Sequence, residues 1–263
     1  MNGIIINIDP VIFKLGSFEV AWHDLVALLG MMIAIPIFIY RLKKRGFESS
    51  EFLAFYPWVV VAMVVGARLF HVADQWYLYA DNYLAALQFW EPSGLATWGG
   101  LIGGAVATFI FAKRKHWPLG RLADALVPAV LVGQIVARVG CLIAGDAYAD
   151  PTDLPWALIY AHEDAVMPAN LIGVPMHPYP AYEMIWNLIG LLLLWRLERF
   201  LHNDGVLFIG YLAWYSVARI VLSLVREERI WFWGLQEAQV LAIVLLVTSV
   251  VLLVHRLKHP VTT

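Results

Sequence analysis

The sequence predicts an all-α integral membrane protein of seven transmembrane helices, with its N-terminus outside the cell and its C-terminus in the cytoplasm. Of its 263 residues, 61% are hydrophobic and only 14% are charged, and the mean hydropathy is +0.71. A water-soluble globule of this length could not bury so much apolar surface. Two further observations support the prediction: apolar stretches of membrane-spanning length, and the placement of lysine and arginine.

The apolar stretches follow one another along the whole chain, and most approach the roughly 20 residues that a helix needs to cross a bilayer. The third is short and rich in glycine, and the fifth begins with polar residues, so both suit the core of a bundle. The chain is expected to form one membrane domain, 1–263. Its seven expected helices lie at about residues 20–40, 52–72, 97–113, 122–143, 180–197, 205–225 and 236–256.

The basic residues predict the orientation of these helices. If the N-terminus is outside, most of the 18 Lys and Arg residues fall in loops on the cytoplasmic side, in agreement with the positive-inside rule. The first twenty residues lack a basic n-region and a small-residue cleavage site, so no cleavable signal peptide is expected. The residues on the cytoplasmic side are Arg41, Lys43, Lys44, Arg45, Lys113, Arg114, Lys115, Arg121, Arg196, Arg199, Arg256 and Lys258.

Two longer segments, 73–96 and 144–179, then fall on the outer side of the membrane. Both are rich in Trp and Tyr, whose rings favour the boundary between headgroups and acyl chains. They form either an ordinary aromatic belt, or an interfacial arm (73–96) and a head segment (144–179) that cover a lipid-facing cavity.

Four arginines stand inside or at the rims of the apolar stretches: Arg68, Arg138, Arg219 and Arg226. A charge at that depth costs about 3 kcal/mol or more. Arg219 and Arg226 are seven residues apart, or two helical turns, so one helix face would carry both. A single such arginine can be a structural ion pair or a snorkelling residue. Four of them near one leaflet favour an anionic ligand, because guanidinium groups match phosphate oxygens, and the anion at that depth is a phospholipid headgroup.

Other classes of function have little support. No two histidines show a metal-ligand spacing such as H-E-x-x-H, so neither a metal nor a cofactor is expected. A net charge of −2 gives no indication of nucleic-acid binding, and one cysteine excludes an internal disulfide framework. The halves of the chain show no strong internal repeat, and the arginines gather at one leaflet, which argues against a transporter.

Five separated motifs follow, in order and spacing, those of one known family. They are DPVIFKLGSFEVAWHDL (9–25), WGGLIGG (98–104), ARVGCLIAGD (137–146), HPYPAYE (177–183) and YSVARIVLSLVRE (215–227). With these motifs the sequence resembles the bacterial prolipoprotein diacylglyceryl transferases, from about residue 9 to the last helix. The resemblance implies a multi-pass enzyme of the bacterial inner membrane. It would move the diacylglyceryl group of phosphatidylglycerol to the thiol of a lipobox cysteine in a prolipoprotein signal peptide and release glycerol phosphate, the first step of lipoprotein maturation.

The resemblance also implies the site residues. The family signature, of the form G-R-x-G-N-F-x-N-G-E, aligns with residues 137–146, where Arg138 and Gly140 match and Asp146 replaces glutamate. Asp146 would orient Arg138 or accept a proton. Catalytic roles are expected for Arg138, Asp146, His23 and Arg226. Substrate binding is expected for Arg68, Gly99, Gly100, Gly140, His177, Tyr182, Glu183, Arg219 and Gln239.

The chain departs from the family pattern at several polar positions. Trp98 stands where the family has the histidine considered for proton transfer, His23 replaces a tyrosine, and Pro180 replaces a glutamine. His23 is therefore the candidate base for an acceptor thiol, and otherwise a rim histidine bonded to backbone or water. Cys141 replaces an asparagine, and it either packs as a small apolar residue or is a thiolate stabilised by Arg138.

These departures leave three functions open. The first is the family reaction, which suits the arginines because they stabilise negative charge on a leaving phosphate. The second is a diverged relative that uses the same cavity with another lipid or acceptor. The third is a non-catalytic phospholipid-binding membrane protein that keeps the arginines without the chemistry.

Overall fold

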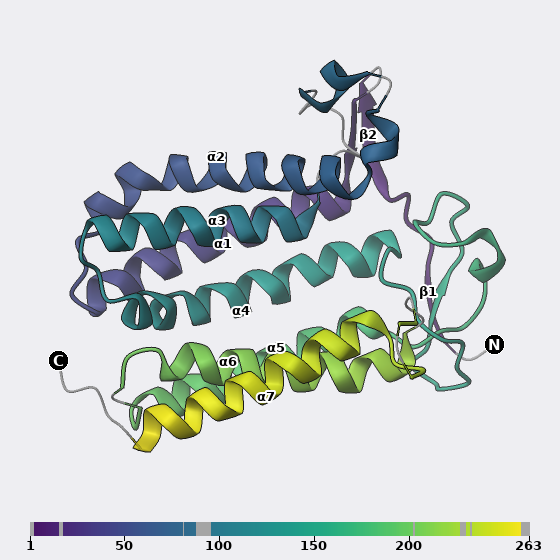
Figure 1. The fold of residues 1–263 in the computed structure, drawn as a ribbon. Coiled ribbons are helices and arrows are strands. Elements are labelled where there is room, and N and C mark those ends of the chain that lie inside the picture. Colours follow the sequence, from purple (N-terminus) through teal and green to yellow (C-terminus); the bar gives the residue numbers. More distant parts are fainter. Residues whose placement is uncertain are drawn as a thin grey trace. The chain divides into compact units, whose positions relative to one another are not determined.

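The computed structural model describes residues 3–15, 18–80, 82–87, 96–201, 203–226, 230–231 and 233–258. Within these residues the chain forms seven α-helices, one at each of the stretches expected from hydropathy (Figure 1). Contacts between Cα atoms divide it into two compact units, Met1–Arg41 with Ala123–Thr263 (unit 1) and Leu42–Leu122 (unit 2). The helices are α1 (Trp22–Lys44), α2 (Ser49–Asp74), α3 (Thr97–Arg114), α4 (Leu119–Ala144), α5 (Tyr179–Glu198), α6 (Val206–Leu222) and α7 (Glu237–Lys258).

Five of the described helices are long and apolar enough to cross a membrane: α1, α2, α4, α7, and α6 together with the 3-10 turn that extends it to Val225. Large apolar side chains stay exposed along them, and on α7 both Val244 and Val251 are 61% exposed. Such a surface is unfavourable in water and stable against lipid acyl chains. The protein is therefore a helical, multi-pass membrane protein.

In unit 1, α1 and α4 approach each other closely at glycines. A methyl group on Gly30 of α1 would lie 3.0 Å from the carbonyl oxygen of Gly133 on α4. Membrane helices gain little from burying apolar groups against each other, so small residues that allow close backbone contact are a main source of packing energy. This crossing aligns the beginning of α1 with the end of α4.

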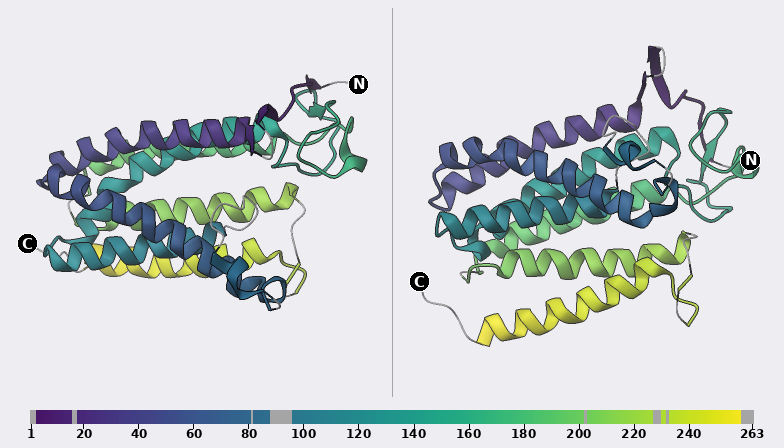
Figure 2. Two further views of the ribbon diagram at one scale, coloured as in Figure 1. Left: turned by 90° about the horizontal axis from the view of Figure 1, so that it is seen from above. Right: turned by 45° about the horizontal axis from the view of Figure 1, so that its top comes forward.

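Helices α4, α5 and α6 share one apolar core in unit 1. It consists of Val127, Leu131, Leu194, Leu207 and Tyr211. Buried Asp124 of α4 also caps α6, because its two carboxylate oxygens accept the N–H groups of Gly205 and Phe208 at 2.8 Å each. Two otherwise unpaired donors at the start of α6 are thus satisfied. Helix α7 lies beside α6 (Figures 1 and 2).

The expected head segment, 144–179, folds together with the N-terminus. Strand β1 (Ile4–Ile6) pairs in parallel with β4 (Leu158–Tyr160), with Ile4 opposite Leu158. Ile6, Leu158 and Tyr160 of this pair form a small buried cluster with Met176. The next two strands, β2 (Val11–Leu15) and β3 (Phe18–Ala21), form an antiparallel hairpin that leads directly into α1. The N-terminal segment therefore fixes both the head and the first residues of α1.

Unit 2 consists of α2, α3 and two short 3-10 helices, η1 (Trp76–Leu78) and η2 (Tyr83–Leu87). Helices α2 and α3 run side by side, and a methyl group on Gly66 would lie 3.0 Å from the Cα of Gly103. The expected arm, 73–96, includes η1 and η2, while its residues 81 and 88–95 lie outside the described part of the chain.

Candidate active site

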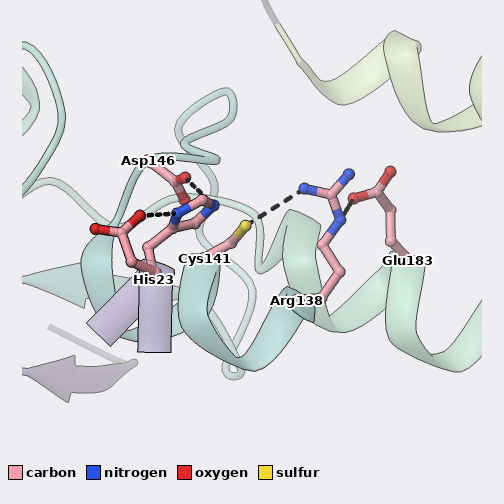
Figure 3. A network of polar contacts seen from close by, with 6 residues as sticks. His23, Arg138, Cys141, Asp146 and Glu183 are labelled. Atoms are coloured by element: carbon pink, nitrogen blue, oxygen red, sulfur yellow. Dashed lines mark hydrogen bonds and ion pairs between the residues drawn. The ribbon is translucent and has the colours of Figure 1, made fainter. Parts of the chain in front are cut away.

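The polar residues of unit 1 gather where α4 ends. Helix α4 stops at Ala144 because Gly145 adopts a φ of +81°, a left-handed conformation that glycine tolerates and that commonly ends helices. The N–H of Gly145 donates to the carbonyl of Cys141 at 2.9 Å. The chain then turns, so that the side chain of Asp146 faces the first turn of α1 (Figure 3).

Arg138, on the last turns of α4, forms an ion pair with Glu183 of α5 (Figure 3). The glutamate side chain is 13% exposed and the arginine side chain 30%. A guanidinium N–H of Arg138 also donates to the Sγ of Cys141 at 3.4 Å. Arg138 therefore contacts both Glu183 of α5 and Cys141 of its own helix. Its carboxylate partner is Glu183, whereas Asp146, expected as one possible partner of Arg138, contacts His23 instead.

Tyr179, at the beginning of α5, connects the other arginines to Glu183. Its hydroxyl donates to Glu183 Oε1 at 3.1 Å and accepts an N–H of Arg219 at 2.7 Å. The guanidinium of Arg226 lies over the same ring, 4.9 Å from its centroid, in a cation–π contact. Tyr179 is fully buried. Three guanidinium groups are thus connected through one tyrosine and one glutamate.

The expectation that one helical face carries both Arg219 and Arg226 is wrong. Helix α6 ends at Leu222, a 3-10 turn (Ser223–Val225) follows, and Arg226 has extended backbone angles. The backbone carbonyl of Val225 accepts the N–H of Asp150 at 2.9 Å, and Gln236 Nε2 donates to the carbonyl of Arg226 at 2.6 Å. These bonds hold the chain after α6, so that both arginines still reach Tyr179.

His23, Cys141 and Asp146 form a second cluster, on the other side of Arg138 (Figure 3). Each offers one side-chain atom that could bind a metal ion, and these atoms lie within 4.8 Å of one another. His23 Nε2 lies 3.5 Å from Asp146 Oδ2, and His23 Nδ1 lies 3.4 Å from Asp24 Oδ1. The other carboxylate oxygen of Asp146, Oδ1, is buried and has no hydrogen-bond partner among the described residues.

Gly140 brings this cluster together. A methyl group on Gly140 would lie 2.9 Å from the Cα of His23 and 3.2 Å from its carbonyl oxygen. Only glycine therefore allows the beginning of α1 to lie this close to α4. Gly140 thus makes a packing contact that sets the distance between His23 and Cys141, and its expected role in substrate binding stays a prediction.

Tyr160 supports the end of α4 from the head segment. Its hydroxyl donates to the carbonyl of Leu142 at 2.9 Å, and its ring packs below Gly145. Burial raises the pKa of the Tyr160 phenol above its usual value, so the group remains a neutral hydrogen-bond donor at physiological pH.

Three further site residues expected in unit 1, His177, Tyr182 and Gln239, form hydrogen bonds with residues outside the arginine network. His177 Nδ1 lies 3.3 Å from the hydroxyl of Tyr182, which also accepts the indole N–H of Trp156 at 3.1 Å. Gln239 is buried, and its Oε1 accepts the backbone N–H of Gln236 at 3.0 Å. That bond caps the start of α7 from the third helical position, as in a capping box. Substrate contacts for these residues stay predictions.

The remaining expected site residues belong to unit 2. Arg68 is buried, and its guanidinium donates to the backbone carbonyls of Ala85 and Ala86 at 2.6 and 2.9 Å. It also lies over the ring of Tyr79, so Arg68 fastens η1 and η2 to α2. Gly99 contacts the backbone of Gly66 so closely that no methyl group would fit, whereas Gly100 has more room. A role for these three in substrate binding stays a prediction.

Tyr179 and Asp24 were not among the expected site residues. Tyr179 lies inside the motif HPYPAYE, and nothing in the sequence shows that it is buried beside the arginines. Asp24 directly follows His23, and a carboxylate next to a candidate histidine could have indicated a residue that orients the ring.

Comparison with known proteins gives a consistent result. Residues 10–255 match the family model of the prolipoprotein diacylglyceryl transferases. A phosphatidylglycerol–prolipoprotein diacylglyceryl transferase of Dehalococcoides mccartyi is 32% identical over 254 residues, which cover 96% of this chain and 95% of the relative. An enzyme of the same name from Lysinibacillus sphaericus is 30% identical and covers 97% of this chain and 95% of its own length. A third, from Lactobacillus acidophilus, is also 30% identical, covering 98% and 92%.

Proposed function

The chain belongs to the prolipoprotein diacylglyceryl transferase family, and we propose that it transfers the diacylglyceryl group of phosphatidylglycerol to a prolipoprotein at the site formed by α1, α4, α5 and α6. The acceptor atom is the thiol of the lipobox cysteine. The observation that carries the proposal is the connected set of Arg138, Arg219 and Arg226 around Tyr179 and Glu183.

The reaction is a displacement at the glyceryl carbon that bears the phosphate. The sulfur of the acceptor forms a bond to this carbon, the carbon–oxygen bond to phosphate breaks, and glycerol phosphate leaves with the electron pair. Negative charge therefore grows on the phosphate oxygen. Preorganised guanidinium groups stabilise such charge better than water does, because they need no reorientation during the reaction.

The fixed orientation of the arginines comes from their partners. Glu183 holds the guanidinium of Arg138, and the hydroxyl of Tyr179 holds that of Arg219. The backbone of Arg226 is held by Gln236 Nε2, which donates to its carbonyl, and by the N–H of Asp150, which donates to the carbonyl of Val225; its guanidinium lies over the ring of Tyr179. These contacts fix the positions of the guanidinium groups, and planar guanidinium groups suit bidentate recognition of phosphate.

The acceptor thiol must lose its proton, since thiolate is the reactive form. We assign this step to the cluster of His23, Cys141 and Asp146, beside Arg138. His23 Nε2 can accept the proton directly, while Asp24 on Nδ1 and Asp146 near Nε2 favour the protonated ring electrostatically.

In the membrane we propose seven spans, with the N-terminus outside and the C-terminus cytoplasmic, in the bacterial inner membrane. The five apolar helices support a multi-pass arrangement. The glycine-rich α3 and the polar start of α5 suit interior positions, and the distribution of Lys and Arg supports the orientation. The head would then lie on the outer side, where secreted prolipoproteins arrive.

An assay of glycerol phosphate release tests the function. The purified protein is mixed with phosphatidylglycerol micelles and a lipobox peptide, and Arg138→Ala and Arg226→Ala are compared with the unchanged chain. Each substitution is expected to lower the rate about 100- to 1000-fold, the usual effect of losing one charge-stabilising group. Arg199→Ala, an exposed arginine at the end of α5, is the control and should retain the rate.

No release from the unchanged chain, with phosphatidylglycerol still bound, would overturn the assignment. That result would favour a different acceptor or a lipid-binding protein without catalysis, for which the replaced polar residues His23, Cys141 and Trp98 give a specific reason.

A further inference from the structure

We propose that His23, Cys141 and Asp146 bind a divalent cation of the zinc type, and that the acceptor cysteine binds this cation as the fourth ligand. The inference rests on the proposed function and replaces direct proton transfer to His23 with coordination of the thiol. No local sequence pattern indicates this site, because its ligands come from three separate places: the start of α1, the last turn of α4 and the loop after α4.

The set of ligand atoms fits zinc. Zinc takes nitrogen, sulfur and oxygen ligands, and sites that act on a substrate keep three protein ligands and one open position. A histidine, a cysteine and an aspartate provide these three ligand types, with the ligand atoms within 4.8 Å of one another. In a tetrahedral zinc site with bonds of roughly 2.0–2.3 Å, ligand atoms are about 3.5 Å apart. The 3.5 Å between His23 Nε2 and Asp146 Oδ2 already matches this spacing.

The surroundings of the three ligands fit as well. A metal-bound histidine usually donates its second ring N–H to a carboxylate, which fixes the tautomer. Asp24 Oδ1 lies 3.4 Å from His23 Nδ1 and can accept that hydrogen, so that the lone pair on Nε2 faces Cys141 and Asp146. Arg138 donates to Cys141 Sγ at 3.4 Å, as expected next to a thiolate.

Asp146 gives an independent sign that a cation is needed. Its Oδ1 is buried without a hydrogen-bond partner among the described residues. A buried, unpaired carboxylate oxygen is costly, and a bound cation removes that cost. Among the described residues a second group of this kind, Asp9, His162 and Asp164, contains no sulfur and is more exposed.

The cation supplies the activation that the reaction needs. A thiol that coordinates a divalent cation is deprotonated, and its proton passes to solvent. The resulting thiolate sulfur bonds to the glyceryl carbon, the carbon–oxygen bond to phosphate breaks, and the electron pair leaves with glycerol phosphate. Arg138 contacts Cys141 of the cation cluster and Glu183 of the arginine network. The thiolate and the leaving phosphate would therefore both lie next to Arg138. Cys141 itself does not receive the diacylglyceryl group, because the resulting thioether would be too stable to transfer that group to the acceptor cysteine.

Cobalt is the probe for this site. The full-length protein is purified in detergent, stripped with a chelator and titrated with Co²⁺, which gives a near-ultraviolet sulfur-to-cobalt band when a thiolate binds and strong visible bands in four-coordinate sites. Cys141 is the one cysteine of the chain, so any sulfur band reports on it. One Co²⁺ per chain is expected, and Cys141→Ser should abolish the sulfur band.

Matched variants separate the cluster from adventitious binding. His23→Ala and Asp146→Asn should each weaken the cobalt site at least about tenfold, and Asp24→Asn about 10- to 100-fold, as for other residues that orient a ligand. His162→Ala, which alters the second group, should leave the sulfur band unchanged. Adding a lipobox peptide should strengthen the sulfur band, whereas the same peptide with serine for cysteine should not.

The absence of a sulfur band, or a band that the cysteine peptide does not change, would overturn the proposal. So would full transfer activity in the chelated protein and in Cys141→Ser; in that case the transferase function would stand and only the cation site would fail. Cobalt binding and peptide capture without any transfer from phosphatidylglycerol would have the opposite meaning: the site would stand and the proposed function would fail.

Discussion

At the scale of single residues, the contact between Arg138 and Glu183 is central to the account. In the proposed mechanism the guanidinium of Arg138 contacts the phosphate, and Glu183 orients that guanidinium. The ion pair is partly buried, so its electrostatic effect is greater than that of a surface pair, while the exposed part of Arg138 limits it.

Glu183→Gln should therefore lower the transfer rate by about tenfold, which corresponds to ~1.4 kcal/mol of lost transition-state stabilisation. The amide keeps the shape and can still accept the Tyr179 hydroxyl, but it no longer holds the charge of Arg138. Glu198→Gln is the matched control, because it breaks an ion pair with Arg41 at the other end of α5. Equal effects of the two substitutions in the release assay would argue for general weakening of α5 instead.

Tyr179→Phe separates the hydroxyl from the ring. The phenylalanine keeps the cation–π contact with Arg226 but loses the bonds to Arg219 and Glu183. We expect the transfer rate to fall about tenfold, ~1.4 kcal/mol, and the free energy of unfolding to fall by about 1–3 kcal/mol.

Tyr211→Phe provides the comparison for Tyr179→Phe. Tyr211 is also buried, and the substitution removes one hydrogen bond, the one that its hydroxyl accepts from the amide of Gln134. It should lose a similar amount of stability in a thermal unfolding experiment and retain the transfer rate. A comparable loss of activity in both variants would show that Tyr179 acts through stability alone.

At the scale of elements, glycine contacts set the distance between α1 and α4. Gly140→Ala would place a methyl group 2.9 Å from the Cα of His23, where backbone has to move. We expect the free energy of unfolding to fall by about 1–3 kcal/mol and the transfer rate to fall as His23 shifts away from Cys141.

Gly210→Ala on α6 is the control for this helix contact, since its methyl group would meet only Leu194 Cδ2 at 3.5 Å. It should be neutral, or stabilise the protein by about 0.5–1 kcal/mol, because alanine favours helix over glycine. Thermal unfolding in detergent measures both variants. A stable, fully active Gly140→Ala protein would contradict the close crossing of α1 and α4.

Hydropathy and spacing predicted the helices well, because a run of about 20 apolar residues has few other stable arrangements. The ends were less predictable: α6 stops at Leu222, and only bonds from Asp150 and Gln236 to the following chain show how Arg226 returns to the site. The pairing of β1 with β4 joins residues more than 150 positions apart, and no local pattern in either strand indicates the other. The same holds for His23 and Asp146, which meet only because Gly140 lets α1 approach.

At the scale of the whole molecule, the orientation in the membrane can be tested with cysteine labelling. Glu163→Cys in the head and Arg114→Cys at the end of α3 are exposed positions, and the native Cys141 is buried. In intact cells a membrane-impermeant maleimide should label position 163, and it should label position 114 only after the membrane is opened. The unchanged chain gives the background. Reversed labelling would contradict the N-out, C-in orientation.

The sequence as a whole supports the family reaction more strongly than its single polar residues do. Family membership follows from a match over residues 10–255, yet His23, Cys141 and Trp98 differ from the family motif at polar positions. The retained arginines and the altered cluster on the other side of Arg138 point to unchanged handling of the lipid phosphate and altered activation of the thiol.

The most direct test of the central claim is the mass of the acceptor. The purified chain is incubated with a lipobox peptide and phosphatidylglycerol of defined acyl chains, and the peptide is examined by mass spectrometry beside an otherwise equal sample with phosphatidylethanolamine. With phosphatidylglycerol we expect the mass of the peptide to increase by one diacylglyceryl group on the cysteine, and we expect Arg138→Ala to abolish this increase. An unmodified peptide with phosphatidylglycerol, or modification only with the other lipid, would contradict it.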